Sequence, residues 1–408
     1  MNSFSLYKIF NNTSVATIYL ILLNVQFISI EGDGTSILKV SAMLLAPILF
    51  YLKSSDINKA LVWGVLYWLM CLCCSSFHDG FRFSTLGYLG MFIATYILFY
   101  SLIYKGAYTL DFFINLLKRL IIAYGVVLLL QQLCMIIGIH HMPIINLSNQ
   151  FFLELTKLPS LSVEPSHTAR ILTVAMLAYW RCCSIKKGNQ LSLKDLINKE
   201  HRGVTFMFFW TMITMGSGTA FVGIAILSLY FVNHKTIFYV IPLFITLFIL
   251  GQQFELKHAD RAIKLFNTLI QSGDVKKIRE TDSSGAYRLI PLVNTVMNTD
   301  YTKAETWFGT GIQTREYAFL RWKRTTDKLA IIEQYGFISL VISIILFFKC
   351  AVRKIFCIET LVFVILFNAS LVNIYFIWGC LMIFTAVRYF QELDEKKLLE
   401  QDESLEKK

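Results

Sequence analysis

Long apolar runs dominate this chain, and they constrain its fold more than any other feature. The 408 residues fall largely into blocks of about 16–22 apolar residues separated by polar connections. About 20 apolar residues in helical form cross the hydrocarbon core of a bilayer. The composition agrees, because 56% of the residues are hydrophobic and only 16% are charged, whereas soluble proteins carry more charge. The sequence therefore predicts an all-α polytopic integral membrane protein with no nucleic-acid partner.

The apolar blocks predict about 12 transmembrane helices (11–13) in a single membrane domain, residues 1–408. The N-terminal 30 residues lack a small-residue cleavage site, so we interpret them as the first span and not as a signal peptide. The predicted spans are residues 14–31, 37–53, 59–76, 85–104, 117–138, 166–183, 203–216, 218–233, 236–252, 330–350, 356–369 and 371–389.

Lys and Arg residues predict the orientation of these spans. Alternate short loops carry most of the positive charge, as in residues 181–202 and 349–354. Positively charged short loops remain cytoplasmic, so both termini are predicted to be cytoplasmic, with a tail at 390–408 that is either a solvated helix or disordered. Segments 139–165 and 253–329 are then outward loops. The second is too long for a simple connector, and we expect it to be functional.

Several kinds of site are missing from the sequence. The nine cysteines form neither a disulfide framework nor a paired CxxC zinc motif. There is no Walker A motif, no G-x-S-x-G motif and no outward DxD or His/Asp cluster for a metal. We expect a protein without metal or cofactor.

Residues 162–170, SVEPSHTAR, place three chemically active side chains at the start of a span. Glu164, His167 and Arg170 recur every three residues and can line one side of a helix that begins at Pro165. Arg170 then lies about 8 Å below the helix start, where an arginine costs a few kcal/mol unless it is hydrated or snorkels. One interpretation is that Arg170 snorkels and Glu164 caps the helix or pairs with Arg170. We favour the other, in which the helix N-terminus and Arg170 bind an anion such as phosphate, with Glu164 or His167 available for proton transfer.

Two further motifs lie in the long outward loop. DSSGAYRLI contains Arg288 and is either a substrate contact or an ordinary polar loop helix. WFGTGIQTRE contains Gly309 and Gly311 ahead of Arg315. Glycines before a helix can present backbone N–H groups to an anion, although a lone GxG is a weak signal and a plain turn is the simpler interpretation.

Two motifs of lower specificity complete the set. RWKR, with Arg321 and Arg324, is a candidate supporting element that contacts either lipid headgroups or substrate. MGSGTA, residues 215–220, interrupts an apolar stretch and is either an outward hairpin between two spans or a re-entrant element.

In their order and spacing these motifs resemble bacterial polysaccharide polymerases of the O-antigen and capsule (Wzy) type. The resemblance covers roughly residues 115–350. It is carried by VEPSHTA at a mid-chain span, SSGAYR in the large outward loop, WFGTGIQTRE and then AIIEQYGFISLVISIILF. MGSGTAFVGIAIL resembles the serine-centred turn of the polymerase and O-antigen ligase superfamily.

The resemblance implies a GT-C-like, inverting and metal-independent glycosyltransferase at the outer face of the bacterial cytoplasmic (inner) membrane. It would polymerise repeat units carried on undecaprenyl diphosphate into O-antigen, capsular or exopolysaccharide. Further partners would be membrane lipids, a chain-length co-polymerase and a flippase. Arg170, Arg288 and Arg315 match the family's active outward arginines and would bind the diphosphate. Glu164 is the preferred base, because it lies nearer the water-exposed mouth than His167.

Other functions remain open at this point. An O-antigen ligase uses the same donor, although EPSH favours the polymerase. A transporter of lipid-linked oligosaccharide predicts an internal repeat and cations throughout a central cavity, whereas these cations cluster in outward loops. A structural or sensor protein would use the large loop to bind a partner.

Overall fold

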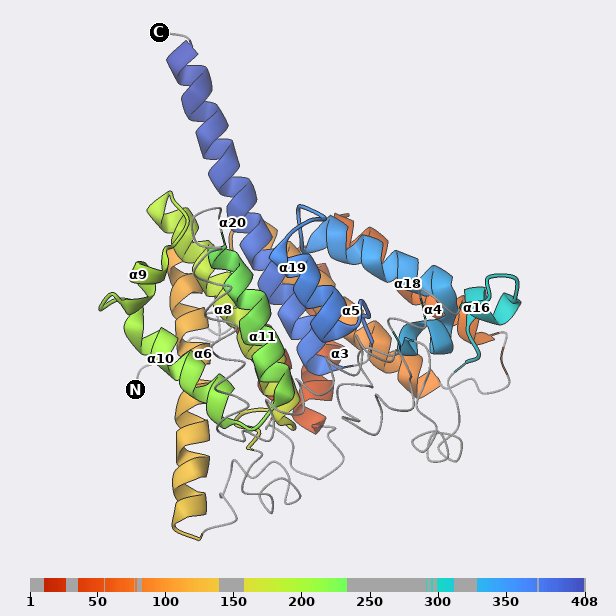
Figure 1. Ribbon diagram of the computed structural model, residues 1–408. Coiled ribbons are helices and arrows are strands. Elements are labelled where there is room, and N and C mark those ends of the chain that lie inside the picture. The colour runs from red at the N-terminus through yellow and green to blue at the C-terminus, as the bar shows by residue number, and fades with distance from the viewer. Residues whose placement is uncertain are drawn as a thin grey trace, which may run out of the picture.

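A computed structural model of the chain describes residues 11–26, 36–54, 56–76, 78, 83–138, 158–232, 291, 295, 299–311, 329–372 and 374–406. Every regular element among them is helical (Figure 1). In chain order they are α2 (Asn12–Asn24), α3 (Ile37–Lys53), α4 (Lys59–Ser76), α5 (Phe83–Tyr104), α6 (Leu110–Ile136), α8 (Pro165–Lys187), α9 (Leu193–Ile197), α10 (Arg202–Thr214), α11 (Gly218–Ser228), η1 (Leu229–Phe231), α16 (Ala304–Phe308), α18 (Ala330–Cys350), α19 (Ile358–Leu361), the π-helical η2 (Val362–Leu366) and α20 (Tyr375–Glu406).

Four of the described helices are long and apolar enough to cross a membrane, namely α4, α5, α6 and α18. The apolar helices α2 and α11–η1 are shorter. The structure fits an α-helical polytopic membrane protein, but the described residues do not provide the 12 predicted spans. One reason is length, since the 13 residues of α10 extend only about 20 Å. The predicted span 236–252 lies outside the described residues.

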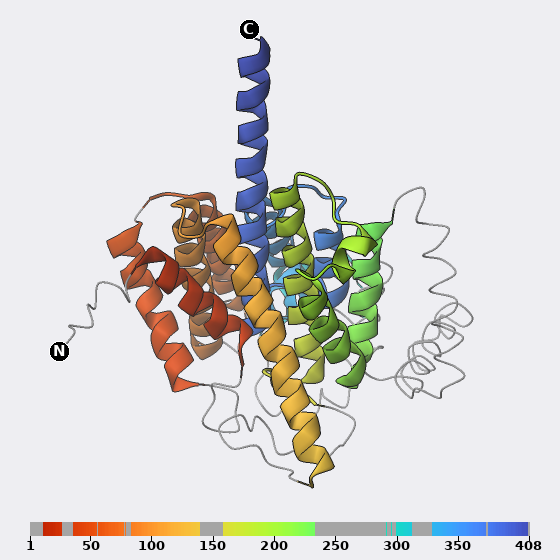
Figure 2. The same ribbon diagram turned by 90° about the vertical axis from the view of Figure 1, so that its left-hand side faces the viewer.

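Helix boundaries agree with the sequence at several places. Helices α3, α4 and α18 begin and end at the predicted residues. The predicted last span and tail form one continuous helix, α20, of 32 residues, which agrees with a helical tail and leaves the membrane boundary at residue 390 a prediction. The tail is rich in Glu, Lys and Leu and lacks Gly and Pro, so nothing in it terminates a helix. The C-terminal half of α20 extends away from the other helices of the bundle (Figures 1 and 2).

Helix α8 lies at the centre of one half of the bundle. It packs against α6, α11 and α20, while α18 packs against α4 and α16. Every residue from Ile171 to Trp180 is buried, which is the pattern of a helix enclosed on all sides. The two arginines of α8, Arg170 and Arg181, lie towards opposite ends of this buried stretch.

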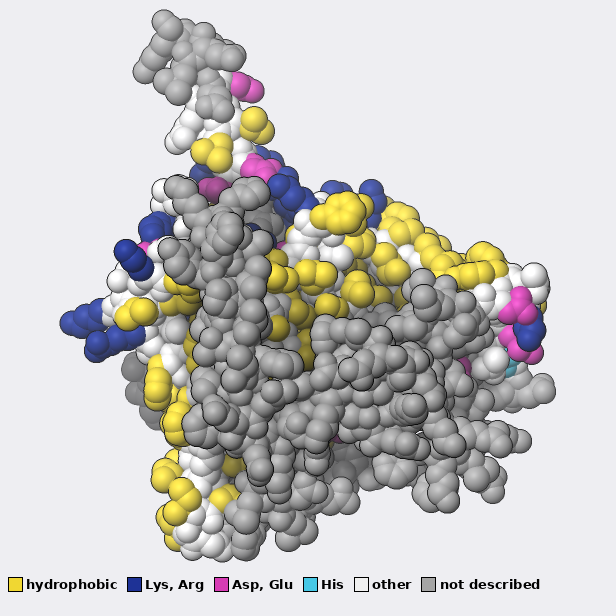
Figure 3. Space-filling model, viewed as in Figure 1, with side chains coloured by type: hydrophobic (Ala, Val, Ile, Leu, Met, Phe, Trp, Pro, Cys, Tyr) yellow, Lys and Arg dark blue, Asp and Glu magenta, His cyan; other side chains and the backbone are white. Residues whose placement is uncertain are grey.

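Ion pairs identify one end of the bundle, which we call the basic end. Lys186 at the end of α8 binds Asp111 at the start of α6 at 2.7 Å, and Arg353 after α18 binds Glu395 of α20. Lys and Arg side chains gather where α20 leaves the bundle (Figure 3). The opposite end contains the end of α2 and the beginnings of α8 and α20, and we call it the site end. Loops predicted to share one side of the membrane thus lie together, and which side they face stays a prediction.

Candidate functional site

The chain approaches α8 through a buried segment, residues 158–163, that polar side chains hold in place. Ser160 has a positive φ of 54°, which costs a non-glycine residue about 1 kcal/mol or more. Gln131 of α6 offsets this cost, because its amide accepts from the Ser160 N–H at 2.9 Å and donates to the Ser160 carbonyl at 3.3 Å. The Ser160 hydroxyl also donates to the Tyr124 carbonyl at 2.6 Å. The start of α8 is therefore fixed against α6.

Helix α8 begins as predicted, with Pro165 in its first turn and Glu164 as the N-cap residue. The Glu164 carbonyl accepts from the N–H groups of His167 and Thr168 at 3.0 and 3.2 Å. Its carboxylate makes no capping hydrogen bond, so the interpretation of this side chain as a cap is wrong. The carboxylate instead accepts from the Ser166 hydroxyl at 3.1 Å and lies 3.9 Å from His167 Nε2.

Gln26, just after α2, determines which ring nitrogen of His167 carries a proton. Its Oε1 accepts from the Val163 N–H at 3.2 Å, and His167 Nδ1 lies 3.1 Å from the same oxygen. Because a backbone N–H can only donate, the Gln26 atom at this position must be the oxygen, and His167 Nδ1 must carry a proton. A neutral His167 then has its acceptor lone pair on Nε2, the nitrogen nearer Glu164. At 3.9 Å, Nε2 and the Glu164 carboxylate are near each other but lie beyond hydrogen-bond distance.

Arg170 shares an aromatic neighbour with His167. The Arg170 guanidinium carbon lies 5.5 Å from the centre of the Phe376 ring, and the His167 and Phe376 ring centres are 4.4 Å apart. Phe376 is completely buried, and it belongs to the first turn of α20. The structure thus brings Glu164, His167 and Arg170 together, with the carboxylate 49% exposed, the imidazole 21% exposed and the guanidinium one turn deeper.

Lys39 is a second cation at the site end, and the sequence analysis missed it. It is only 2% exposed. Its ammonium donates to the Val25 carbonyl at 2.8 Å and lies 4.7 Å from the Tyr375 ring centre. A lysine in the first turn of an otherwise apolar predicted helix was the sequence signal that could have identified Lys39 as a buried cation. Together with Gln26, Lys39 ties the end of α2 to the beginnings of α3, α8 and α20.

The WFGTG and EQYG motifs, which are more than 20 residues apart, interlock in space. Gly336 interrupts α18 with φ 81°, and a Cβ there would lie 2.0 Å from the Trp307 carbonyl oxygen. A Cβ on Gly309 would lie 2.7 Å from the Gln334 backbone. Both positions therefore require glycine, for backbone conformation and for close approach.

Backbone donors of the predicted anion cradle are already engaged within the protein. The Gly309 N–H donates to the Glu305 carbonyl at 2.8 Å, and the Thr310 N–H donates to the Glu333 carbonyl at 2.7 Å. A Cβ on Gly311 would lie 2.8 Å from the His78 side chain. The structure gives Gly309 and Gly311 a role in packing, and a role in substrate binding stays a prediction.

The MGSGTA motif forms the connection between α10 and α11, with Gly216 at φ 74°. The Met215 carbonyl accepts from the Leu158 N–H at 3.3 Å. This geometry agrees with the hairpin interpretation and places the turn beside the segment that leads into α8.

Four predicted site residues cannot be placed relative to this cluster. Arg288, Arg315, Arg321 and Arg324 lie outside the described residues, and their approach to Arg170 stays a prediction.

The chain was compared with protein-family models, curated proteins and solved structures. No family model, curated protein or solved structure matches it.

Proposed function

We propose that this protein polymerises polysaccharide repeat units by glycosyl transfer between lipid diphosphate-linked substrates. The observation that carries the proposal is the Glu164–His167–Arg170 cluster, in which a partly exposed carboxylate and an imidazole lie above a guanidinium at a helix start. The resemblance of the sequence to Wzy-type polymerases supplies the substrate class. About 12 spans, a GT-C-like fold and a bacterial inner membrane with cytoplasmic termini are parts of the same proposal.

The proposed reaction displaces a diphosphate from the anomeric carbon of the donor glycan. A hydroxyl of the acceptor repeat unit attacks this carbon, a new C–O bond forms, and the bond to the diphosphate oxygen breaks. The hydroxyl proton passes to Glu164, whose carboxylate is the more exposed of the two candidate bases. Undecaprenyl diphosphate leaves with both electrons of the broken bond, and the configuration at the anomeric carbon inverts.

Arg170 is the proposed cation for the leaving group. Negative charge grows on the diphosphate as its bond breaks, and a fixed guanidinium lowers the energy of that transition state. Packing against Phe376 holds the Arg170 side chain in position before substrate arrives. Arg288 and Arg315 are proposed to complete the diphosphate site from the large outward loop.

His167 and Gln26 are proposed to position the base. With its Nδ1 proton directed to Gln26, the imidazole presents Nε2 on the side of Glu164. The imidazole can accept the transferred proton from Glu164 and release it after the product leaves the site. Glu164 and His167 then act as a coupled pair.

Deletion of the gene and complementation in cells tests the proposal. Gel analysis of surface polysaccharide should show single-repeat material in the deletion strain and a long-chain ladder after complementation. Glu164→Gln and Arg170→Ala should fail to restore the ladder, whereas Arg202→Ala, which removes an exposed arginine near the basic end, should restore it. Complete absence of polysaccharide from lipid A–core in the deletion strain would identify a ligase. An unchanged ladder with both site variants would show that the assigned site is wrong.

A further inference from the structure

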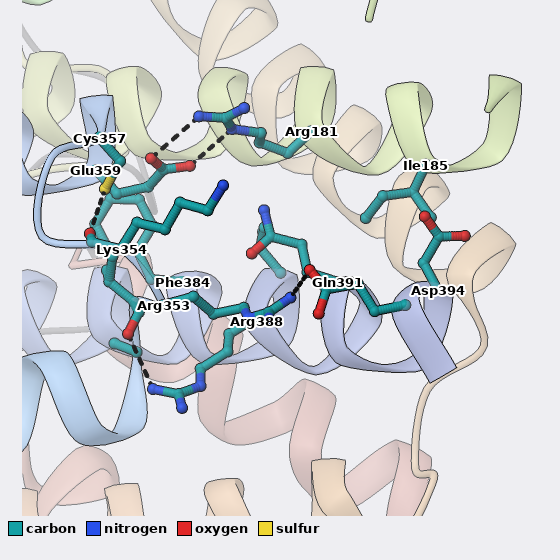
Figure 4. Close-up of a pocket in the computed structure, with 14 residues that line it drawn as sticks. Arg181, Ile185, Arg353, Lys354, Cys357, Glu359, Phe384, Arg388, Gln391 and Asp394 are labelled. Atoms are coloured by element: carbon teal, nitrogen blue, oxygen red, sulfur yellow. Dashed lines mark hydrogen bonds and ion pairs between the residues drawn. The ribbon is translucent and has the colours of Figure 1, made fainter. Parts of the chain in front are cut away.

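A cavity of about 210 Å³ lies at the basic end of the bundle, remote from the Glu164 cluster (Figure 4). Its walls come from the end of α8, the connection between α18 and α19, the start of α19 and the middle of α20. Because α18 is one of the four helices of membrane-spanning character, the connection after it lies where a spanning helix meets lipid headgroups.

Three of the four cationic side chains that line this cavity form ion pairs with carboxylates of the same chain. Arg181 binds Glu359 through two hydrogen bonds of 2.8 and 3.3 Å. Arg353 is paired with Glu395. Arg388 binds Glu392 and caps the end of α18 by donating to two carbonyl groups. These pairs fix the walls and leave little net charge on them.

Lys354 is the fourth cation, and it differs from the other three. It makes no ion pair with another described residue. Its side chain reaches from the α18–α19 connection into the space between α8 and α20, where the Gln391 amide faces it (Figure 4). An ammonium and an amide N–H₂ that converge from two elements can bind a phosphate oxygen.

Asp394 lies at the other side of the same cavity, beside Ile185 (Figure 4). Within the described part of the chain it also makes no ion pair. A purely anionic ligand would bring its negative charge towards this carboxylate. A ligand with a phosphate at Lys354 and a cationic group at Asp394 satisfies both ends.

The connection that carries Lys354 also exposes two large apolar side chains. Ile355 is 62% exposed and Phe356 is 97% exposed. Leaving both in water costs about 3 kcal/mol or more, whereas a basic residue followed by an aromatic one is favourable at a membrane surface. Both side chains follow Lys354, which lines the cavity, so their exposed apolar surface is next to it.

We propose that this cavity is a binding site for a phospholipid whose headgroup carries a primary amine, of the phosphoethanolamine type. The phosphate binds Lys354 and Gln391, the amine binds Asp394, and the acyl chains contact Ile355 and Phe356. The lipid bridges α8, the α18–α19 connection and α20. The inference requires only that the chain resides in a membrane, and it holds whether or not the protein is a polymerase.

Native mass spectrometry of the full-length, delipidated protein tests this site. The probes are dioleoyl phosphatidylethanolamine, phosphatidylglycerol and phosphatidylcholine, titrated separately. We expect the wild type to bind phosphatidylethanolamine tightest. Lys354→Ala should weaken phosphatidylethanolamine and phosphatidylglycerol binding about tenfold, and Lys354→Arg should restore most of it. Phe356→Ser should weaken all three lipids to a similar extent.

The Asp394→Asn variant tests recognition of the lipid amine independently of recognition of the phosphate. It should abolish the preference for phosphatidylethanolamine over phosphatidylglycerol while leaving phosphatidylglycerol binding unchanged or stronger. Lys194→Ala, which removes an exposed charge from α9, is the matched control and should behave as the wild type. Thermal unfolding of each variant in detergent shows whether it is folded.

Three results would overturn the proposal. Equal binding of the three lipids by the wild type would show that the headgroup is not recognised. Unaltered binding by the folded Lys354→Ala protein would show that the lipid lies elsewhere. Displacement of the lipid by equimolar inorganic phosphate would assign the cavity to a soluble phosphate compound.

Discussion

Arg170 and Arg181 belong to the same helix, α8, but their guanidinium groups have different neighbours. Arg181, at the basic end, is held by the buried Glu359 carboxylate in a two-point ion pair and packs over the Tyr230 ring at 5.3 Å. Arg170, at the site end, packs over Phe376 beside His167. Both guanidinium groups lie over an aromatic ring, which favours a cation, and the ion pair with Glu359 fixes the position of Arg181. Arg181 is thus tied to the fold near α19, whereas Arg170 lies in the proposed diphosphate site.

Replacement of Arg170 should have the largest effect of all the substitutions, and it should change the activity but not the stability of the protein. In purified protein, Arg170→Ala should lower the rate of polymer formation about 100-fold or more, because the leaving diphosphate loses its cation. Arg170→Lys should recover part of the rate, since it keeps the charge but loses the planar fork. The melting temperature should stay near that of the wild type. An equal loss of stability and activity would remove the contrast with Arg181.

Replacement of Arg181 should destabilise the protein without harming the chemistry. Arg181→Ala leaves the Glu359 carboxylate, only 8% exposed, without its partner. We expect a loss of about 2 kcal/mol in the free energy of unfolding, towards the low side for a buried pair because Arg181 is partly exposed. The double variant Arg181→Met/Glu359→Gln should recover most of this loss. Denaturant unfolding in detergent measures it, and failure of the double variant to recover would contradict the pairing argument.

Gln26 offers a finer test of the site end. Gln26→Leu removes the acceptor shared by His167 Nδ1 and the Val163 N–H. We expect kcat to fall about tenfold through loss of orientation, with a change in the pH dependence of kcat because the ring environment alters. Gln26→Glu keeps an acceptor and should retain most of the rate. A reduced kcat with an unchanged pH profile would indicate a purely structural role for Gln26.

The smallest effect is expected from the ion pair between Lys187 and the partly buried Asp195 near the basic end. The Lys187 ammonium, 2.7 Å from Asp195, and the Ser192 donors lower the pKa of Asp195 to about 2. A carboxylate with a lowered pKa stabilises the fold above its unfolded value, about 3.9, and this contribution disappears as the pH falls through about 2. The melting-temperature difference between the wild type and Asp195→Asn should be constant from pH 7 to about 5 and vanish near pH 2. A difference that disappears above pH 5 would assign the shift to another group.

Local sequence signals predicted the helix start and the grouping of side chains at the beginning of α8, because the relevant interactions are short in range. The three-residue spacing of Glu164, His167 and Arg170 placed them on one side of a helix, and the structure has them there. Pro165 marked the first turn, since proline fits a position where no N–H is needed. The glycines of the WFGTG and EQYG motifs were noticed, but their shared reason, mutual close packing, depends on contact between segments far apart in the chain.

By itself the sequence determined the helical class, the apolar character of the longest helices and the boundaries of α3, α4 and α18, because helix formation in an apolar run depends on residues a few positions apart. Tertiary structure decided which charges meet. Gln26 with His167, Lys39 with Tyr375, and Arg181 with Glu359 are all pairs from different helices. No periodicity within one segment encodes such pairs, since they arise only when separate helices pack side by side.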